Sequence, residues 1–181
     1  APRRPPLPTN PTLVWPGISI WDPADLKEAV KAFHDAGYQV ACHAIGDAAV
    51  DLALDAIEAA MNANPRPDPR HRIEHAQVVN PSDFKRFAEL KIIASMQPAH
   101  AISDKRWAES RLGEYRVLGA YSWHLMKSYG VHVPFGTDFP VESINPYQTL
   151  YAAVSRQDVD GEPFGGWQPQ ERISREAALA G

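Results

Sequence analysis

Three residues that could bind a divalent metal ion lie where predicted β-strands end. His43 follows the apolar segment YQVAC, His75 closes the segment HRIEH, and Asp138 follows VHVPFGT. Because the carboxyl ends of parallel strands meet at one edge of a sheet, these side chains are expected to converge on one pocket. Imidazoles and a carboxylate are typical ligands of a catalytic zinc ion, and a carboxylate can also transfer protons. The placement predicts a hydrolytic metal site with His43, His75 and Asp138 as ligands.

Two further polar residues lie at the end of another predicted strand. Gln97 closes that strand, and His100 follows it three residues later. Both are candidate substrate-binding residues, because they are expected at the same edge of the sheet as the metal site. For His100, a hydrogen bond within its loop is an equal alternative that the sequence leaves open.

Other histidines are interpreted as structural. His132 begins its predicted strand, so at about 3.3 Å per residue it lies roughly 20 Å from Asp138. By the same rise, His71 lies about 13 Å from His75, which is too far for the two to share one metal ion. His34 falls in the last turn of a predicted helix, where an imidazole suits the helix dipole.

The segment HRIEH also matches the H-x-x-E-H pattern of a class of zinc peptidases. That chemistry requires a helix, which would place both histidines on one metal ion. Here the segment lies between two proline-containing stretches and is followed closely by Val78 and Val79. Apolar β-branched residues between turn signals favour a strand, so the peptidase interpretation is rejected.

A repeating unit of helix, break, apolar strand and polar loop positions the candidate residues. Strands are predicted over 38–42, 71–79, 91–96 and 131–135. Helices are predicted with Asp22 and Asp47 as N-cap residues, with starts at Asn80 and Asn145, and over 115–129. Strands that alternate with helices favour parallel βαβ crossovers and therefore an α/β fold. Four such units would form about half of a TIM-type (β/α)8 barrel, with a small doubly wound sheet as the alternative.

The composition excludes several classes of partner. The chain has 181 residues, a net charge of −4 and 22% charged residues of mixed sign, so no nucleic-acid or membrane partner is expected. No apolar run is long enough to span a bilayer. The single cysteine, Cys42, excludes an internal disulfide bond. A cytoplasmic location is assumed by default.

Both ends of the sequence predict a piece of a longer protein. The chain opens on the proline-rich APRRPPLPTNP without a methionine and closes on SREAALAG, which begins like a helix. A natural linker at the front is the alternative. Residues 1–21 are interpreted as a lead-in segment and residues 22–181 as a partial barrel domain. Because four parallel strands leave open edges, missing sequence or a homo-oligomer is expected to complete the barrel.

The chain resembles amidohydrolase family 3, in the YtcJ-like branch of the metal-dependent amidohydrolase superfamily. The resemblance covers about residues 24–179 and rests on four motifs in order, CHAIGDAAVDLALDAIE, RHRIEHAQVVNPSDFKRFAEL, IIASMQPAHAISD and FGTDFPVESINPYQTLYAAVSRQ. It implies strands five to eight of a (β/α)8 barrel. It also implies metal ligands at His43, His75 and Asp138, with Asp138 as general base and acid. Gln97 matches the glutamine of the family's strand-seven QP motif.

The resemblance implies a metal-dependent hydrolase that cleaves non-peptide carbon–nitrogen bonds in small amide-type substrates. The expected cofactor is a divalent metal ion, with zinc as the first choice. The family's His-x-His pair on strand one and its strand-four lysine have no counterpart in this chain. The alternative is therefore a non-catalytic, self-associating half-barrel. A serine hydrolase is excluded, because the sequence contains no G-x-S-x-G motif.

Overall fold

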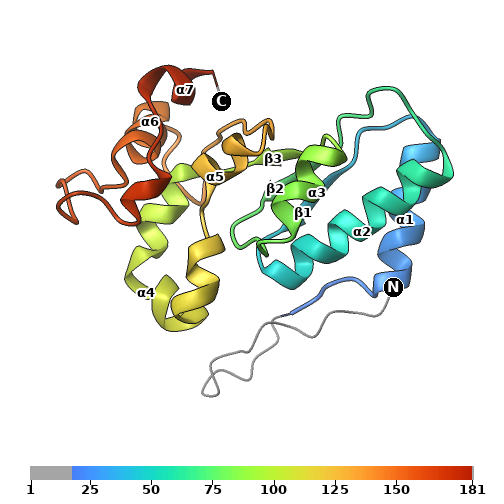
Figure 1. Cartoon of the computed structure of the whole chain (residues 1–181), viewed down its shortest axis with the longest axis horizontal. Helices are drawn as coiled ribbons and strands as arrows, with labels where there is room; N and C mark the ends of the chain where they lie inside the picture. The colour runs from blue at the N-terminus through green and yellow to red at the C-terminus, as the bar shows by residue number, and fades with distance from the viewer. Residues whose placement is uncertain (1–17, 181) are drawn as a thin grey trace.

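The computed structural model describes residues 18–180, which place a small parallel sheet between two groups of helices (Figure 1). The elements follow in the order α1 (Pro23–Asp35), β1 (Ala41–Ala44), α2 (Asp47–Ala63), β2 (Arg72–His75), α3 (Asp83–Glu89), β3 (Ile93–Ser95), α4 (Pro98–Arg116), the 3-10 turn η1 (Val117–Gly119), α5 (Trp123–Ser128), α6 (Pro146–Ser155), the 3-10 turn η2 (Pro169–Glu171) and α7 (Arg175–Leu179). Most of the proline-rich lead-in lies outside the described residues. None of the described helices could span a membrane.

The three strands form one parallel sheet in the order β1-β2-β3. His43 lies opposite Glu74, and Ala44 lies opposite His75, so the first two predicted ligands are one register step apart on neighbouring strands. A helix connects each strand to the next, as a parallel sheet requires. The predicted α/β class and parallel arrangement are confirmed.

The fourth predicted strand is present only as an extended segment beside β3. Backbone N–H groups of Ala94 and Met96 donate to the carbonyl oxygens of His132 and Pro134, and Gly136 donates back to Met96. These hydrogen bonds form a single parallel β-bridge, between Met96 and Phe135. A second bridge would need an N–H group at Pro134, which proline lacks. The segment 131–136 therefore follows the sheet without forming a regular strand.

Two helix starts follow directly from the sequence. The Asp22 side chain accepts a hydrogen bond from the Ala24 N–H group at 2.8 Å and caps α1, as predicted. Asn145 caps α6 in the same way, through the N–H group of Tyr147. For α2 the prediction was wrong by one residue, because Gly46 occupies the cap position and Asp47 begins the helix.

The region after β3 differs from the prediction most. A single helix was expected over 115–129, but the chain forms α4, then η1, then the short α5. Tyr121, with a φ of 54°, interrupts the expected helix before α5, and Gly113, with a φ of 76°, kinks α4 near its end. Helix α4 itself was not predicted, because its buried stripe contains only small or polar residues such as Ala101 and Ala108.

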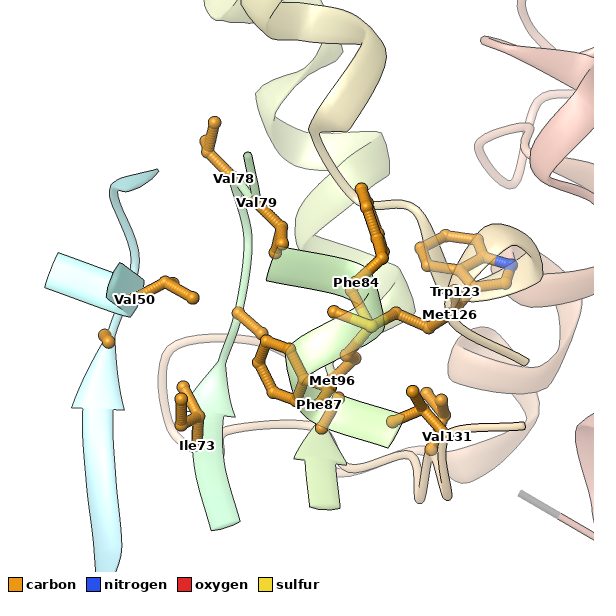
Figure 2. Packing of buried hydrophobic residues seen from close by; sticks show 14 of the residues in the cluster. Val50, Ile73, Val78, Val79, Phe84, Phe87, Met96, Trp123, Met126 and Val131 are labelled. Atoms are coloured by element: carbon orange, nitrogen blue, oxygen red, sulfur yellow. The ribbon is translucent and has the colours of Figure 1, made fainter. Parts of the chain in front are cut away.

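The hydrophobic core lies between the sheet and the helices that cover it (Figure 2). Ile73 of β2 and Met96, just after β3, gather with Phe84 and Phe87 of α3, and all four are nearly inaccessible to solvent. Burial of each such side chain stabilises the fold by about 1.5–3 kcal/mol. This packing fixes the strand ends on which the candidate site is built.

Candidate metal centre

The structure places all five predicted site residues at the carboxyl end of the sheet. His43 lies in β1, and His75 is the last residue of β2. Gln97 precedes α4 and His100 lies in its first turn, while Asp138 follows the extended segment 131–136. Parallel strands therefore bring residues up to 95 positions apart to the same edge, as the sequence predicted.

His75 is the centre of the arrangement. Its Nδ1 atom lies 2.8 Å from Oε1 of Gln97, and its Nε2 atom lies 3.0 Å from Nδ1 of His43. The rings of His43 and His75 meet edge to face, with centroids 4.5 Å apart. The two predicted imidazole ligands thus present ring nitrogens to each other across a hydrogen-bond distance.

Gln97 fixes the tautomer of His75. The amide Nε2 of Gln97 donates to the carbonyl oxygen of Ser95 at 3.2 Å, which leaves Oε1 as the acceptor that faces His75. His75 must then carry its proton on Nδ1, and its Nε2 keeps a lone pair. A hydrogen bond on the far nitrogen is the usual way in which a protein orients a metal-binding imidazole. Gln97 therefore contacts the predicted ligand itself.

The second half of the arrangement joins His100 to Asp138. His100 Nε2 lies 3.6 Å from Oδ2 of Asp138, a contact too long for a hydrogen bond. The ring of His100 is nearly parallel to that of His75, with centroids 5.8 Å apart. One possible ligand atom from each of His75, His100 and Asp138 lies within 4.8 Å of the others. The contact between His43 and His75 adjoins this set.

Burial differs sharply between the two sides of the site. His75, Gln97 and His100 are 6–7% exposed, whereas 37% of the Asp138 side chain is accessible. His43 is also exposed. The imidazoles of His75 and His100 are therefore largely shielded from water, whereas His43 and the Asp138 carboxylate lie on the side that water can reach.

The backbone is strained at two of the predicted ligands. His75 and the following Ala76 have φ values of 75° and 44°, and Asp138 has a φ of 55°. Residues other than glycine rarely adopt this left-handed region, and such strain gathers at functional sites. Here it turns the chain sharply as each segment leaves the sheet.

His132 and His71 lie away from the site, as predicted. His132 helps to line a hollow of about 460 Å³ at the amino end of the sheet, with Arg72 and Ile93. His71 instead bonds to His34, with 2.8 Å between the two ring nitrogens. Within the segment HRIEH, Arg72–His75 form β2 rather than a helix, so the predicted strand is confirmed.

The family of the chain follows from comparison with known proteins. The model of the amidohydrolase family matches residues 2–180. This chain is an amidohydrolase family member. It is 38% identical over 164 residues to the protein LONG AFTER FAR-RED 3 of Arabidopsis thaliana, and 34% identical over 141 residues to the putative amidohydrolase YtcJ of Bacillus subtilis (strain 168). These alignments cover 90% and 78% of this chain but only 28% and 26% of the relatives.

Two further likenesses concern enzymes. The N-substituted formamide deformylase of Arthrobacter pascens is 26% identical over 167 residues, which are 90% of this chain and 30% of that protein. Among solved structures, an uncharacterized metal-dependent hydrolase from Pyrococcus furiosus superposes with a TM-score of 0.74 at 36% identity, over 90% of this chain and 31% of that one. The amidohydrolase chain thus spans less than a third of these relatives and has the fold of a partial TIM-type barrel.

A more distant structure shows the fold alone. A variant of atrazine chlorohydrolase TrzN from Arthrobacter aurescens TC1, complexed with zinc and atraton, superposes with a TM-score of 0.54 at 15% identity. The match covers 88% of the amidohydrolase chain and 33% of that one. The doubly wound sheet considered from the sequence is therefore set aside in favour of the partial barrel.

The donor set of this amidohydrolase chain fits a divalent metal ion. Imidazole nitrogens suit zinc, and a carboxylate oxygen completes a mixed set. Two ligands about 2.0–2.1 Å from a tetrahedral ion lie about 3.3 Å apart. The 3.0 Å between His43 and His75 is close to that separation. His43, His75 and Asp138 are therefore residues that could hold such an ion.

One supporting network was missed from the sequence. Asp104 lies one helical turn after His100 on α4, and its Oδ2 accepts hydrogen bonds from the Tyr121 hydroxyl at 2.5 Å and the Gln77 amide at 3.0 Å. Burial, followed by the nearby Asp104 carboxylate, raises the pKa of Tyr121, so the hydroxyl stays a donor. The network ties α4 to the segment after β2. The sequence signal for this network was the four-residue spacing of His100 and Asp104. That spacing places two side chains on the same face only in a helix, and α4 was not predicted.

Proposed function

We propose that this chain carries part of the active site of a metal-dependent hydrolase that cleaves non-peptide carbon–nitrogen bonds. The observation that carries the proposal is the contact between His75 and His43, with Gln97 fixing the His75 tautomer. Membership of the amidohydrolase family supports the reaction class. The expected substrates are small molecules of the amide type. The N-substituted formamide deformylase, whose name describes such a substrate, supports this choice.

In the proposed mechanism, His43, His75 and Asp138 would hold a divalent ion, with zinc as the expected metal. Such an ion, when bound, acts as a Lewis acid and lowers the pKa of water towards neutrality. Asp138 takes a proton from the attacking water and transfers it to the departing nitrogen. The carbon–nitrogen bond breaks, and a carboxylic acid and an amine leave. The partial exposure of Asp138 allows water to reach its carboxylate.

The rest of the barrel is part of the proposal. The chain spans roughly 26–31% of the relatives with which it was compared, so a complete pocket requires further sequence or another chain. Within the described residues, β1 pairs with β2 alone and has one open edge. That edge favours completion by additional strands, and it is also the observation behind the alternative of a self-associating half-barrel without activity.

Zinc titration of the metal-free chain is the test. The wild type is expected to bind about one zinc ion, and His43→Ala and Asp138→Asn should each lose most of that binding without loss of helical structure. Isothermal calorimetry measures the binding, and circular dichroism measures the folding. His132→Ala is the matched control and should bind like the wild type. Equal losses in all three variants, or no zinc binding by the wild type, would reject the metal site in this chain.

Gln97 should influence zinc affinity through His75. Gln97→Leu removes the acceptor for the Nδ1 proton, so zinc affinity should fall by about 10–100-fold. Gln97→Glu keeps an acceptor and should retain most of the affinity. The ¹⁵N resonances of the His75 ring report its tautomer and should change in Gln97→Leu alone. Gln148→Leu, an exposed glutamine on α6, is the control. An unchanged tautomer with unchanged affinity would contradict the positioning role.

A further inference from the structure

His100 presents a buried ring nitrogen that nothing else in the described chain satisfies. The residue is 7% exposed, and its Nε2 atom has no hydrogen-bond partner among residues 18–180. A buried polar atom without a partner costs about 1–3 kcal/mol, so native proteins seldom leave one unexplained. The Asp138 carboxylate lies close to this nitrogen, with its Oδ2 atom 3.6 Å away and outside hydrogen-bond distance. The position of this nitrogen suits a bound ion or molecule that both His100 and Asp138 contact.

Two pairs of side chains have the spacing of neighbouring ligands on one metal ion. Two ligands on one tetrahedral zinc ion lie about 3.3 Å apart. The His43–His75 pair is separated by 3.0 Å and the His100–Asp138 pair by 3.6 Å, so the two separations bracket that value. His75, His100 and Asp138 also share the 4.8 Å limit noted above, whereas His43 lies outside that set and is joined to it through His75.

The position of His100 is fixed independently of any ion. Its backbone N–H group donates to the Gln97 carbonyl oxygen at 3.1 Å in the first turn of α4. One turn later, Asp104 fastens the same helix to Tyr121 and Gln77. The imidazole is therefore preorganised, and little side-chain entropy would be lost when it coordinates an ion.

We propose that His100 Nε2 is a further metal ligand beside His43, His75 and Asp138. The inference rests on the proposed function, because it takes the other three residues as ligands. It replaces the earlier prediction that His100 binds substrate. Three imidazoles and one carboxylate suit zinc or cobalt(II).

Cobalt(II) titration of the metal-free chain tests this assignment, because the visible absorption of cobalt reports its coordination number. The wild type should bind one ion with the intense bands of four-coordinate cobalt. His100→Ala should bind at least about tenfold more weakly and show the weak bands of higher coordination, as water replaces the imidazole. His132→Ala, at the other end of the sheet, should match the wild type. An unchanged affinity and spectrum in His100→Ala would overturn the proposal.

A second measurement does not depend on a variant that folds. Zinc added to the ¹⁵N-histidine-labelled wild type should shift the ring nitrogens of His43, His75 and His100 and leave those of His132 unchanged. Shifts at His43 and His75 without His100 would reject this inference and keep the proposed function. No shift at any of the three would reject the metal site in this chain, and the four-ligand set with it.

Discussion

Arg156→Ala should lower the free energy of unfolding by about 3–5 kcal/mol, the largest loss expected for one substitution in this chain. The guanidinium is fully buried, and it donates to the carbonyl oxygens of Trp167 at 2.7 Å and Tyr121 at 3.0 Å. It also lies over the rings of Trp123 and Trp167, 4.2 Å and 5.0 Å from their centroids. Truncation would leave two buried carbonyl groups without donors and a cavity between two indoles.

The positive charge of Arg156 also contributes to the expected loss of stability. Burial lowers its pKa to about 10, while the nearby Glu171 carboxylate opposes that shift, so the guanidinium remains charged at neutral pH. Glu171 accepts from the N–H groups of His124 and Leu125, which links the arginine indirectly to the start of α5. Loss of the cation would leave the buried Glu171 charge less balanced.

Urea unfolding followed by circular dichroism measures the effect of Arg156→Ala. Arg106→Ala, an exposed arginine on α4, is the matched control and should change stability by less than about 0.5 kcal/mol. Arg156→Lys keeps the charge but lacks the planar donors, so it should fall between the two. A loss of less than about 1 kcal/mol in Arg156→Ala would show that the cluster is not a main source of stability.

The protein should also lose up to about 3 kcal/mol of stability as the pH falls from about 6.5 to about 4. Burial, followed by electrostatic interaction with His34 and Arg66, lowers the pKa of His71 to about 4. Between the two values the unfolded chain binds a proton that the folded chain does not, so acid favours unfolding. The contribution is complete above the unfolded pKa and is lost progressively as the pH falls towards the folded value.

The geometry of the two buried histidines explains why His71 must stay neutral. Its Nδ1 accepts from the N–H group of Val40 at 2.9 Å, so its proton lies on Nε2 and is donated to His34 Nδ1. His34 in turn donates from Nε2 to the carbonyl oxygen of Asn64 at 2.7 Å. A proton added to His71 Nδ1 would face the N–H donor of Val40 and break this chain of bonds.

Urea midpoints measured from pH 4 to 7.5 test the prediction. The wild type should lose stability with acid, and His71→Gln, which cannot titrate there, should show a flatter profile. His132→Gln removes an exposed histidine and should keep the wild-type slope. Parallel profiles for the wild type and His71→Gln would mean that other groups cause the acid sensitivity.

Much of the fold could be predicted because its signals are local. Asp22 and Asn145, each followed by proline, mark helix starts, and the apolar segments before His43 and His75 mark strands. The segment 131–136 was harder to predict. Its apolar residues indicate a β-strand, but Pro134 has no N–H group to donate the next hydrogen bond to β3. Helix α4 carries no wide apolar stripe, so hydrophobic periodicity could not reveal it.

The site could be predicted in its residues but not in its contacts. Strand ends gave His43, His75 and Asp138, because parallel strands share one carboxyl edge. The pairing of Gln97 with His75 depends on how the chain turns after β3. The approach of His100 to Asp138 depends on α4 and on a left-handed turn at Asp138, neither of which has a sequence signal of its own.

The cluster around Arg156 has an optical consequence. Trp123 and Trp167 are 0% and 8% exposed beside the guanidinium, whereas Trp21 and Trp107 are 51% and 40% exposed. Indoles shielded from water emit at shorter wavelengths than wetted ones, and they shift to the red when water reaches them. Among the four tryptophans of residues 18–180, those of the arginine cluster should therefore give the bluest native emission, and a red shift of that emission should report the opening of this cluster without an added dye.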